Sequence, residues 1–156
     1  MAKLNHIGLD AKLSNTLAKE LNLLLAEYSV FYQNVRGYHW NIRGEKFFEL
    51  HLKFEELYTD LHIKIDEIAE RILTLGSTPE QRYSVYFKTA KIKEVECISD
   101  GKKAVENILN AFAVILAKER KILALSSEDE GSNALMSDYI REQEKLVWMY
   151  SAYLNA

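Results

Sequence analysis

Residues 45–76 read EKFFELHLKFEELYTDLHIKIDEIAERILTLG, and this stretch decides the fold. Its apolar residues recur at steps of three and four, as they do along one face of an α-helix; they are Leu50, Phe54, Leu57, Leu61, Ile65, Ile68 and Ile72. Gly76 is a candidate for the residue that ends the helix, and Pro79 prevents its continuation. The stretch therefore predicts one long amphipathic helix that buries its apolar face in a helical bundle.

A second set of side chains on this helix is of the types that bind metal ions: His51, Glu55, Asp66 and Glu70. Its centre lies roughly 130° around the helix from the centre of the apolar stripe, so these side chains face away from their own core. His51 and Glu55 are one turn apart, as are Asp66 and Glu70. The two pairs are roughly 22 Å apart along the axis, so one ion cannot contact both pairs.

The two pairs meet if the same helix of a second subunit packs antiparallel across a two-fold axis. His51 and Glu55 of one copy then face Asp66 and Glu70 of the other, which gives two equivalent sites per dimer. The alternative is a solvated charged face, the common role of charged residues on a helix. His62 lies midway between the pairs, and we interpret it as an interface residue rather than a ligand.

Composition narrows the class of protein. The 156 residues suffice for one domain with a sizeable core, so we expect a single domain over residues 1–156, with residues 1–9 as a flexible N-terminal segment. One proline and six glycines favour long helices, and the net charge of −3 argues against a dedicated nucleic-acid surface. A single cysteine fits a reducing compartment. Without a signal-peptide pattern or an apolar run of about 18 residues, we expect a cytoplasmic protein with no membrane segment.

Three further helical patterns complete the fold prediction. They cover residues 10–38, residues 99 to about 125, and residues 133–153, with Asp10 and Asp100 as candidate N-caps. Short links join the first two helices and the last two. Residues 77–98 are long enough to cross the length of the bundle and include a short helical piece near residues 80–87. We predict an all-α four-helix bundle with one long crossover between helices two and three, the arrangement of ferritin-like bundles.

The sequence lacks the usual signature of an iron site inside such a bundle. Ferritin-like di-iron proteins carry Glu-x-x-His on two helices, but Glu49 precedes His51 by only two residues and the last two helices contain no histidine. A monomeric bundle with an internal di-iron oxidase site is therefore disfavoured. His39 lies beside the short link and can approach His51, and imidazole with carboxylate suits Fe(II). The neighbouring Trp40 is either an interface residue or an electron donor for one-electron oxidising equivalents.

These motifs together resemble the Dps family, the miniferritins or DNA-binding proteins from starved cells. The resemblance runs through residues 39–44 (HWNIRG), 54–58 (FEELY) and 65–76 (IDEIAERILTLG) and covers nearly the whole chain. It implies a hollow homo-dodecamer that oxidises Fe(II), preferably with hydrogen peroxide, and stores a ferric mineral. It also implies an intersubunit ferroxidase site for iron, in which His39, His51 and Glu55 come from one subunit and Asp66 and Glu70 from its mate.

The chain departs from the family pattern in two places. Many members have Asp where this chain has Glu55, whose carboxylate is one methylene further from the backbone. Members that bind DNA typically have a lysine-rich terminal extension, whereas this chain offers only Lys3 and Lys12 before the bundle and no basic residue in its last four positions. We therefore expect weak or absent DNA binding. A structural DNA-compacting, nucleoid-associated protein with little ferroxidase activity is the alternative function.

An acidic loop precedes the last predicted helix and contains Glu128, Asp129 and Glu130. One interpretation is a solvated turn. The other is a cation funnel where subunits meet, because focused negative potential raises the local concentration of cations. In the family that the chain resembles, acidic pores lie on three-fold axes near this part of the chain, so the loop is a candidate for the iron-entry pore.

Overall fold

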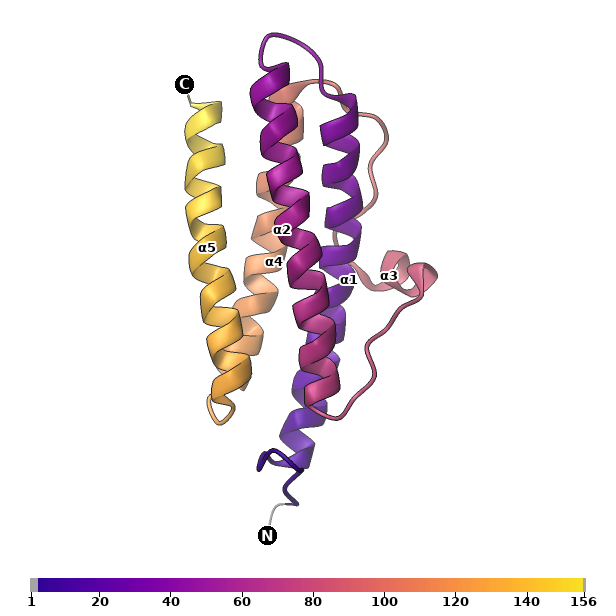
Figure 1. Cartoon of the computed structure of the whole chain (residues 1–156), viewed down its shortest axis with the longest axis vertical. Helices are drawn as coiled ribbons and strands as arrows, with labels where there is room; N and C mark the ends of the chain where they lie inside the picture. Colours follow the sequence, from indigo (N-terminus) through magenta and orange to yellow (C-terminus); the bar gives the residue numbers. More distant parts are fainter. Residues whose placement is uncertain (1–2, 156) are drawn as a thin grey trace.

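A computed structural model describes residues 3–155 and contains five helices within that range (Figure 1). They are α1 (Ala11–Asn41), α2 (Phe47–Thr74), α3 (Tyr83–Thr89), α4 (Gly101–Leu125) and α5 (Glu130–Leu154). The four long helices lie side by side, and α3 sits outside the bundle within the crossover from α2 to α4. The predicted all-α bundle with one crossover is confirmed. No helix of the described residues is long and apolar enough to span a membrane.

Aspartates start three of the long helices. The side chains of Asp10, Asp100 and Asp129 each accept a backbone N–H three residues further on, as N-caps do. At the other end of α2, Gly76 has φ +88°, a conformation that glycine adopts without strain. Helix α5 begins at Glu130, three residues earlier than predicted, because Asp129 rather than a later residue caps it.

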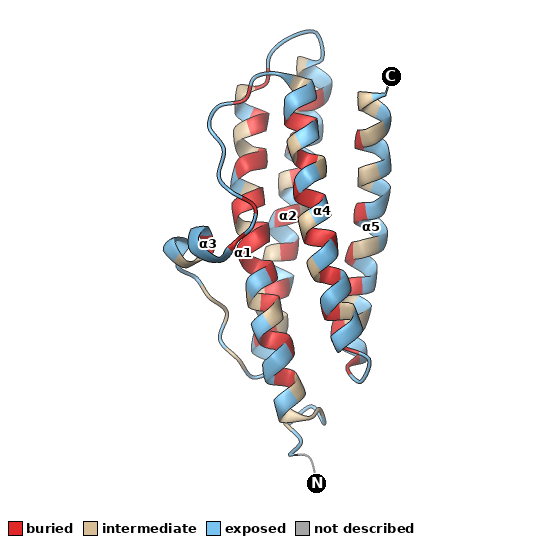
Figure 2. Cartoon of the chain, turned by 180° about the vertical axis from the view of Figure 1, so that it is seen from behind, coloured by how far each residue is buried: buried red, intermediate tan, exposed pale blue. Residues whose placement is uncertain are grey.

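The core lies between the four long helices, and buried residues recur along each of them (Figure 2). Six of the seven residues in the predicted apolar stripe of α2 are buried, and Ile65 is half-buried. Phe31 of α1 packs edge-to-face on Phe112 of α4, with ring centroids 5.3 Å apart. The stripe pattern thus predicted correctly which face of α2 packs into the bundle.

The crossover is attached to α1 by buried polar contacts. Glu27 is fully buried, and its carboxylate accepts the backbone N–H groups of Lys91 at 2.7 Å and Ile92 at 2.9 Å. Asn22 and Asn34, on the same helix, form similar side-chain bonds with the crossover backbone. These contacts fix a long connection that contains only one short helix.

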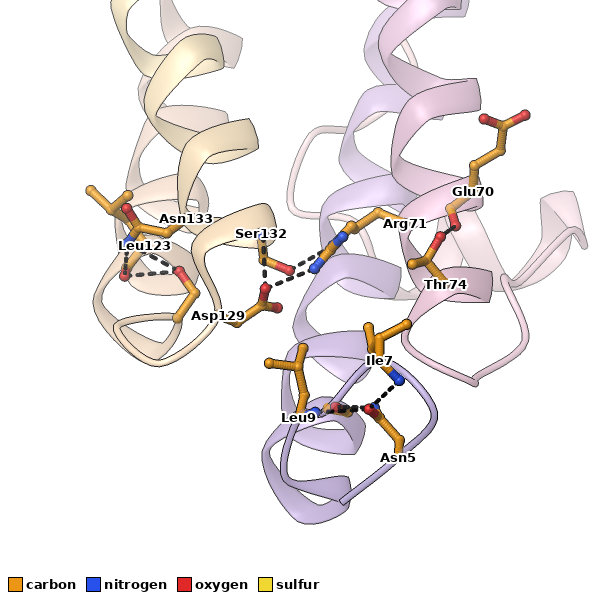
Figure 3. Close-up of polar contacts among 12 residues, drawn as sticks. Asn5, Ile7, Leu9, Glu70, Arg71, Thr74, Leu123, Asp129, Ser132 and Asn133 are labelled. Carbon is orange, nitrogen blue, oxygen red and sulfur yellow. Dashed lines mark hydrogen bonds and ion pairs between the residues drawn. The ribbon is translucent and has the colours of Figure 1, made fainter.

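The segment before α1 folds back on the start of that helix. The side-chain oxygen of Asn5 accepts the backbone N–H groups of Ile7 and Leu9 (Figure 3), and the backbone of Lys3 accepts that of Ala11 at 2.8 Å. Residues 3–9 of the expected flexible segment thus have defined backbone contacts, and residues 1–2 lie outside the described residues.

Candidate metal centre

Two histidines come together where α1 ends and α2 begins. His39 is buried near the end of α1 and His51 is half-buried in the first turns of α2. Their rings stack with centroids 3.8 Å apart and planes 13° apart. The Nδ1 of His39 lies 2.6 Å from the backbone oxygen of His51, and the Nδ1 of His51 lies 2.7 Å from the backbone oxygen of His39. The predicted approach of the two histidines is therefore present.

This exchange of hydrogen bonds determines how the two rings can act chemically. A backbone carbonyl only accepts, so the Nδ1 of each ring carries the proton and donates it. In the neutral imidazole the Nε2 then keeps its lone pair. Metal-binding histidines are commonly oriented in this way, with one nitrogen held by a backbone carbonyl and the other free for the ion. The Nε2 atoms of His39 and His51 therefore keep their lone pairs and could bind an ion.

Aromatic side chains fix the positions of the two rings. Phe47 stacks on His51 with ring centroids 4.9 Å apart, so His51 is held between Phe47 and His39. Tyr58 packs edge-on against His39 at 5.3 Å. Sequence reasoning did not assign these two aromatics, although Phe47 and Tyr58 lie one and two turns from His51 on the same helix. That spacing was the available signal.

The candidate carboxylates lie on the exposed side of α2. Glu55, Asp66 and Glu70 are all exposed, and no side chain of residues 3–155 makes a hydrogen bond or ion pair with their carboxylates. Within that range, no three histidine, cysteine or acidic side chains of one chain come together as a metal-binding group. The arrangement provides an imidazole pair beside Glu55 and a separate carboxylate pair further along the helix.

Similarity to known proteins agrees with this architecture. The family model for the ferritin-like domain matches residues 18–156. A DNA protection during starvation protein of Porphyromonas gingivalis is 46% identical over 94% of this chain and 93% of its own length. The crystal structure of a Dps protein from Vibrio cholerae O1, described as a member of a broad superfamily of ferritin-like diiron-carboxylate proteins, has a TM-score of 0.95 at 58% identity and covers 99% of this chain and 98% of that one.

The chain belongs to the Dps family of ferritin-like proteins. An uncharacterized protein of Haemophilus influenzae is also similar, at 54% identity over 94% of this chain and 92% of that protein. The resemblance in the motifs of α1 and α2 is thereby confirmed as family membership. The coverage shows that the likeness extends over nearly the whole chain.

Beside the histidine pair of this Dps-family chain, Trp40 occupies the last turn of α1. Its side chain is 56% exposed, and the guanidinium of Arg36 lies 4.9 Å from its ring centroid. Arg36 also lies 5.4 Å from the ring centroid of Tyr32, so it is placed between two aromatic rings. Trp40 is thus exposed on the surface next to His39, the position that both of its predicted roles require.

The acidic loop of the Dps-family chain does not present its three carboxylates equally. Glu128 and Glu130 are exposed, whereas Asp129 is 2% exposed and caps α5. Asp129 Oδ1 lies 2.7 Å from Arg71 Nη2 of α2 (Figure 3). Burial raises the pKa of Asp129, but hydrogen bonds from Ser132 and Arg71 outweigh it and lower the pKa below its usual value. The carboxylate of Asp129 is therefore engaged inside the subunit.

Sequence reasoning also missed a polar centre inside the bundle. Tyr28, Glu119 and Gln143 are at most 1% exposed and hydrogen-bond to one another, and the ammonium of Lys64 is buried nearby. The available signal was a polar residue in an apolar stripe, because Glu119 follows Phe112 and Leu116 at helical spacing. This centre lies in the core, whereas the histidine pair lies where α1 ends and α2 begins, and the three carboxylates lie on the exposed side of α2.

Proposed function

We propose that the protein is a ferroxidase and iron-storage protein that protects against oxidative damage. In this proposal it oxidises Fe(II), preferably with hydrogen peroxide, and holds ferric mineral in a dodecameric cage. Membership of the Dps family supports iron storage and protection. The single observation that carries the proposal is the histidine pair, in which both Nδ1 atoms bond to backbone carbonyls and both Nε2 atoms stay available.

The proposed site is completed by a second subunit. His39, His51 and Glu55 come from one subunit, and Asp66 and Glu70 from its mate across a two-fold axis. The roughly 22 Å between the two groups on one helix supports this division, as does the exposure of all three carboxylates. Imidazole and carboxylate ligands suit Fe(II), the substrate. Hydrogen peroxide takes two electrons, so two ferrous ions are oxidised for each peroxide reduced.

Complementation between two inactive variants tests this division. His51→Ala removes a ligand from one half of the site, and Asp66→Ala removes a ligand from the other half. Each variant alone should lose peroxide-dependent Fe(II) oxidation. In a mixed dimer one site carries both defects and the other carries none, so random co-assembly should restore about a quarter of the wild-type sites.

Two controls make the complementation result interpretable. His62→Ala, on the same face of α2, should retain activity because His62 is proposed to be an interface residue only. Mixing His39→Ala with His51→Ala should restore nothing, because both changes fall in the same half-site. Recovery in that second mixture, or none in the first, would contradict a site shared between subunits.

Iron entry is proposed to follow the acidic loop between α4 and α5. Glu128 and Glu130 are the exposed carboxylates there, and Asp129 supports the loop through Arg71. Glu128→Gln with Glu130→Gln should slow iron uptake at low salt and low Fe(II), and saturating Fe(II) should partly restore the rate. Uptake that is unaffected under the low-salt condition would contradict entry through this loop.

Trp40 is proposed to supply the second electron when only one ferrous ion at the neighbouring site reduces a molecule of peroxide. Its exposure and the cation–π contact with Arg36 support a role at the surface beside the metal ligands. Trp40→Phe should keep the rate of Fe(II) oxidation and increase damage to an added radical probe. An unchanged yield of damaged probe would show that Trp40 is an interface residue only.

Size, oxidant and DNA binding are tested separately from the site. The proposed cage has a mass of about twelve times the 18.1 kDa chain and should retain iron after Fe(II) loading. The oxidation of Fe(II) should slow when oxygen replaces peroxide. The net charge of −3 supports weak or absent retardation of duplex DNA at about 0.15 M salt. Tight DNA binding there, together with slow Fe(II) oxidation, would favour the DNA-compacting alternative.

A further inference from the structure

Three helices place polar side chains at one point inside the apolar core. Tyr28 comes from α1, Glu119 from α4 and Gln143 from α5. The hydroxyl of Tyr28 donates to Glu119 Oε1 at 2.5 Å and accepts a hydrogen bond from Gln143 Nε2. The exposed fractions of the three residues are 0%, 0% and 1%. The group is therefore sealed from solvent within the bundle.

Two atoms of this group lack a partner. Glu119 Oε2 and Gln143 Oε1 are buried and have no hydrogen-bond donor among residues 3–155. An ionised carboxylate and an amide oxygen can only accept. A buried acceptor left without a donor is unfavourable, and the Glu119 and Gln143 side chains both contact the same Tyr28 hydroxyl. One proton added on Glu119 Oε2 would give both oxygen atoms a hydrogen-bond partner.

The cations around Glu119 are already engaged elsewhere. From α2, the ammonium of Lys64 contacts the carboxylates of Asp60 and Glu142, each at 2.8 Å. On α4, Arg120 pairs with Glu144 at 3.1 Å on the exposed surface. These cations contribute long-range attraction to Glu119 but donate no hydrogen bond to it.

The remaining titratable neighbour of Glu119 is Tyr139 of α5. Its hydroxyl donates to Glu67 of α2 at 3.1 Å, so it too is engaged elsewhere. On the α1 side, Tyr28 uses its one proton on Glu119 Oε1. No donor from the packed helices therefore reaches Glu119 Oε2.

We propose that the centre of the bundle is a proton-binding site, in which Glu119 is a neutral carboxylic acid and its Oε2 hydroxyl donates to Gln143 Oε1. The three side chains then form a closed ring: Gln143 donates to Tyr28, Tyr28 donates to Glu119, and Glu119 donates to Gln143. The added proton gives both unpartnered oxygen atoms a hydrogen bond. It also removes an uncompensated negative charge from the core, where such a charge is costly.

The electrostatics of the group agree with this assignment. Burial raises the pKa of Glu119 to about 7, and the hydrogen bond from Tyr28 and the charge of Lys64 offset only part of that rise. Burial also raises the pKa of Tyr28 well above its usual value, so Tyr28 remains a donor. Folding therefore binds a proton at Glu119. The resulting stability is fully present below the unfolded pKa and is lost as the pH rises through about 7.

Infrared difference spectroscopy of the assembled protein tests the proton directly. The readout is the carbonyl stretch of a protonated carboxylic acid, in the spectrum of wild type minus that of Glu119→Gln. We expect the band at about pH 5.5 and expect it to fade as the pH is raised through about 7. Absence of the band at about pH 5.5 would overturn the proposal, because the two oxygens would then bond to water instead.

Stability provides an independent readout. Between about pH 5 and about pH 8, the unfolding equilibrium constant of the wild type should rise roughly 50- to 100-fold more than that of Glu119→Gln. Glu106→Gln makes the same change at an exposed position of α4 and should follow the wild type. Parallel pH profiles for wild type and Glu119→Gln would overturn the proposal. If Glu119→Gln does not assemble, isotopic labelling of the glutamate carboxyl carbons in the wild type must shift the same band.

Discussion

The same substitution at two helical glycines should have opposite effects on stability. A Cβ built on Gly131 of α5 would lie 2.7–2.9 Å from the guanidinium atoms of Arg71, whereas a Cβ on Gly37 of α1 would have nothing within 4 Å. Contacts under 3 Å force a displacement. Gly131→Ala should therefore push Arg71 away from Asp129 and Ser132, and Gly37→Ala should fit without change.

The magnitudes follow from the contacts that are lost. Arg71 bonds to Asp129 at 2.7 Å and to Ser132 at 2.9 Å. A hydrogen bond to a charged group contributes about 1.5–3 kcal/mol, and Gly→Ala within a helix returns up to about 1 kcal/mol. We expect Gly131→Ala to be destabilised by about 1–2 kcal/mol. We expect Gly37→Ala to be stabilised by up to about 1 kcal/mol.

Thermal unfolding followed by circular dichroism measures both changes. For a chain of this size, 1 kcal/mol corresponds to about 2–4 °C. The double variant Arg71→Ala with Gly131→Ala isolates the cause, because the new methyl group then meets no guanidinium. There the glycine substitution should be neutral or stabilising. If Gly131→Ala is equally destabilising with and without Arg71, the steric reasoning is refuted.

Three further predictions concern the core and its connections. Phe54→Ala, at a fully buried position of α2, should cost about 3–5 kcal/mol through the cavity it creates, measured by urea unfolding. Glu27→Gln should lose part of its bonding to the crossover N–H groups and speed amide hydrogen exchange at Lys91, with exchange in α5 as the unaffected reference. Lys64→Met keeps an apolar side chain in place of the buried stem but removes the ammonium, which contacts two partly exposed carboxylates. We expect it to lower the free energy of unfolding less than Lys64→Ala, which also loses the apolar contacts of the stem.

Local spacing and segment length gave the most reliable predictions. The periodicity of apolar residues identified the buried face of α2, and the length of residues 77–98 identified the crossover. The predicted start of α5 was wrong by three residues because Asp129 caps the helix, and its carboxylate also contacts Arg71 of the distant helix α2. Local patterns carry no information about that contact.

For the candidate site, the sequence predicted the approach of His39 to His51 but not the orientation of the two rings. The spacing of His51, Glu55 and Asp66 indicated an outward-facing set, and the short link indicated that His39 approaches His51. The bonds between each Nδ1 and the opposite carbonyl depend on how two helix ends meet, which no residue pattern specifies. Glu119 was missed for a related reason, since its hydrogen-bond partners come from α1 and α5, far away in the sequence.

The crossed imidazole–carbonyl bonds also have an evolutionary consequence for residues 42–46. Each histidine is held by the backbone of the opposite helix, so the separation of the two rings is set without help from the five residues that connect the helices. Gly44, with φ +109°, lets this short segment reverse direction, and most of it is exposed. The exposed side chains of Glu45 and Lys46 can therefore vary while the two imidazole rings keep their spacing.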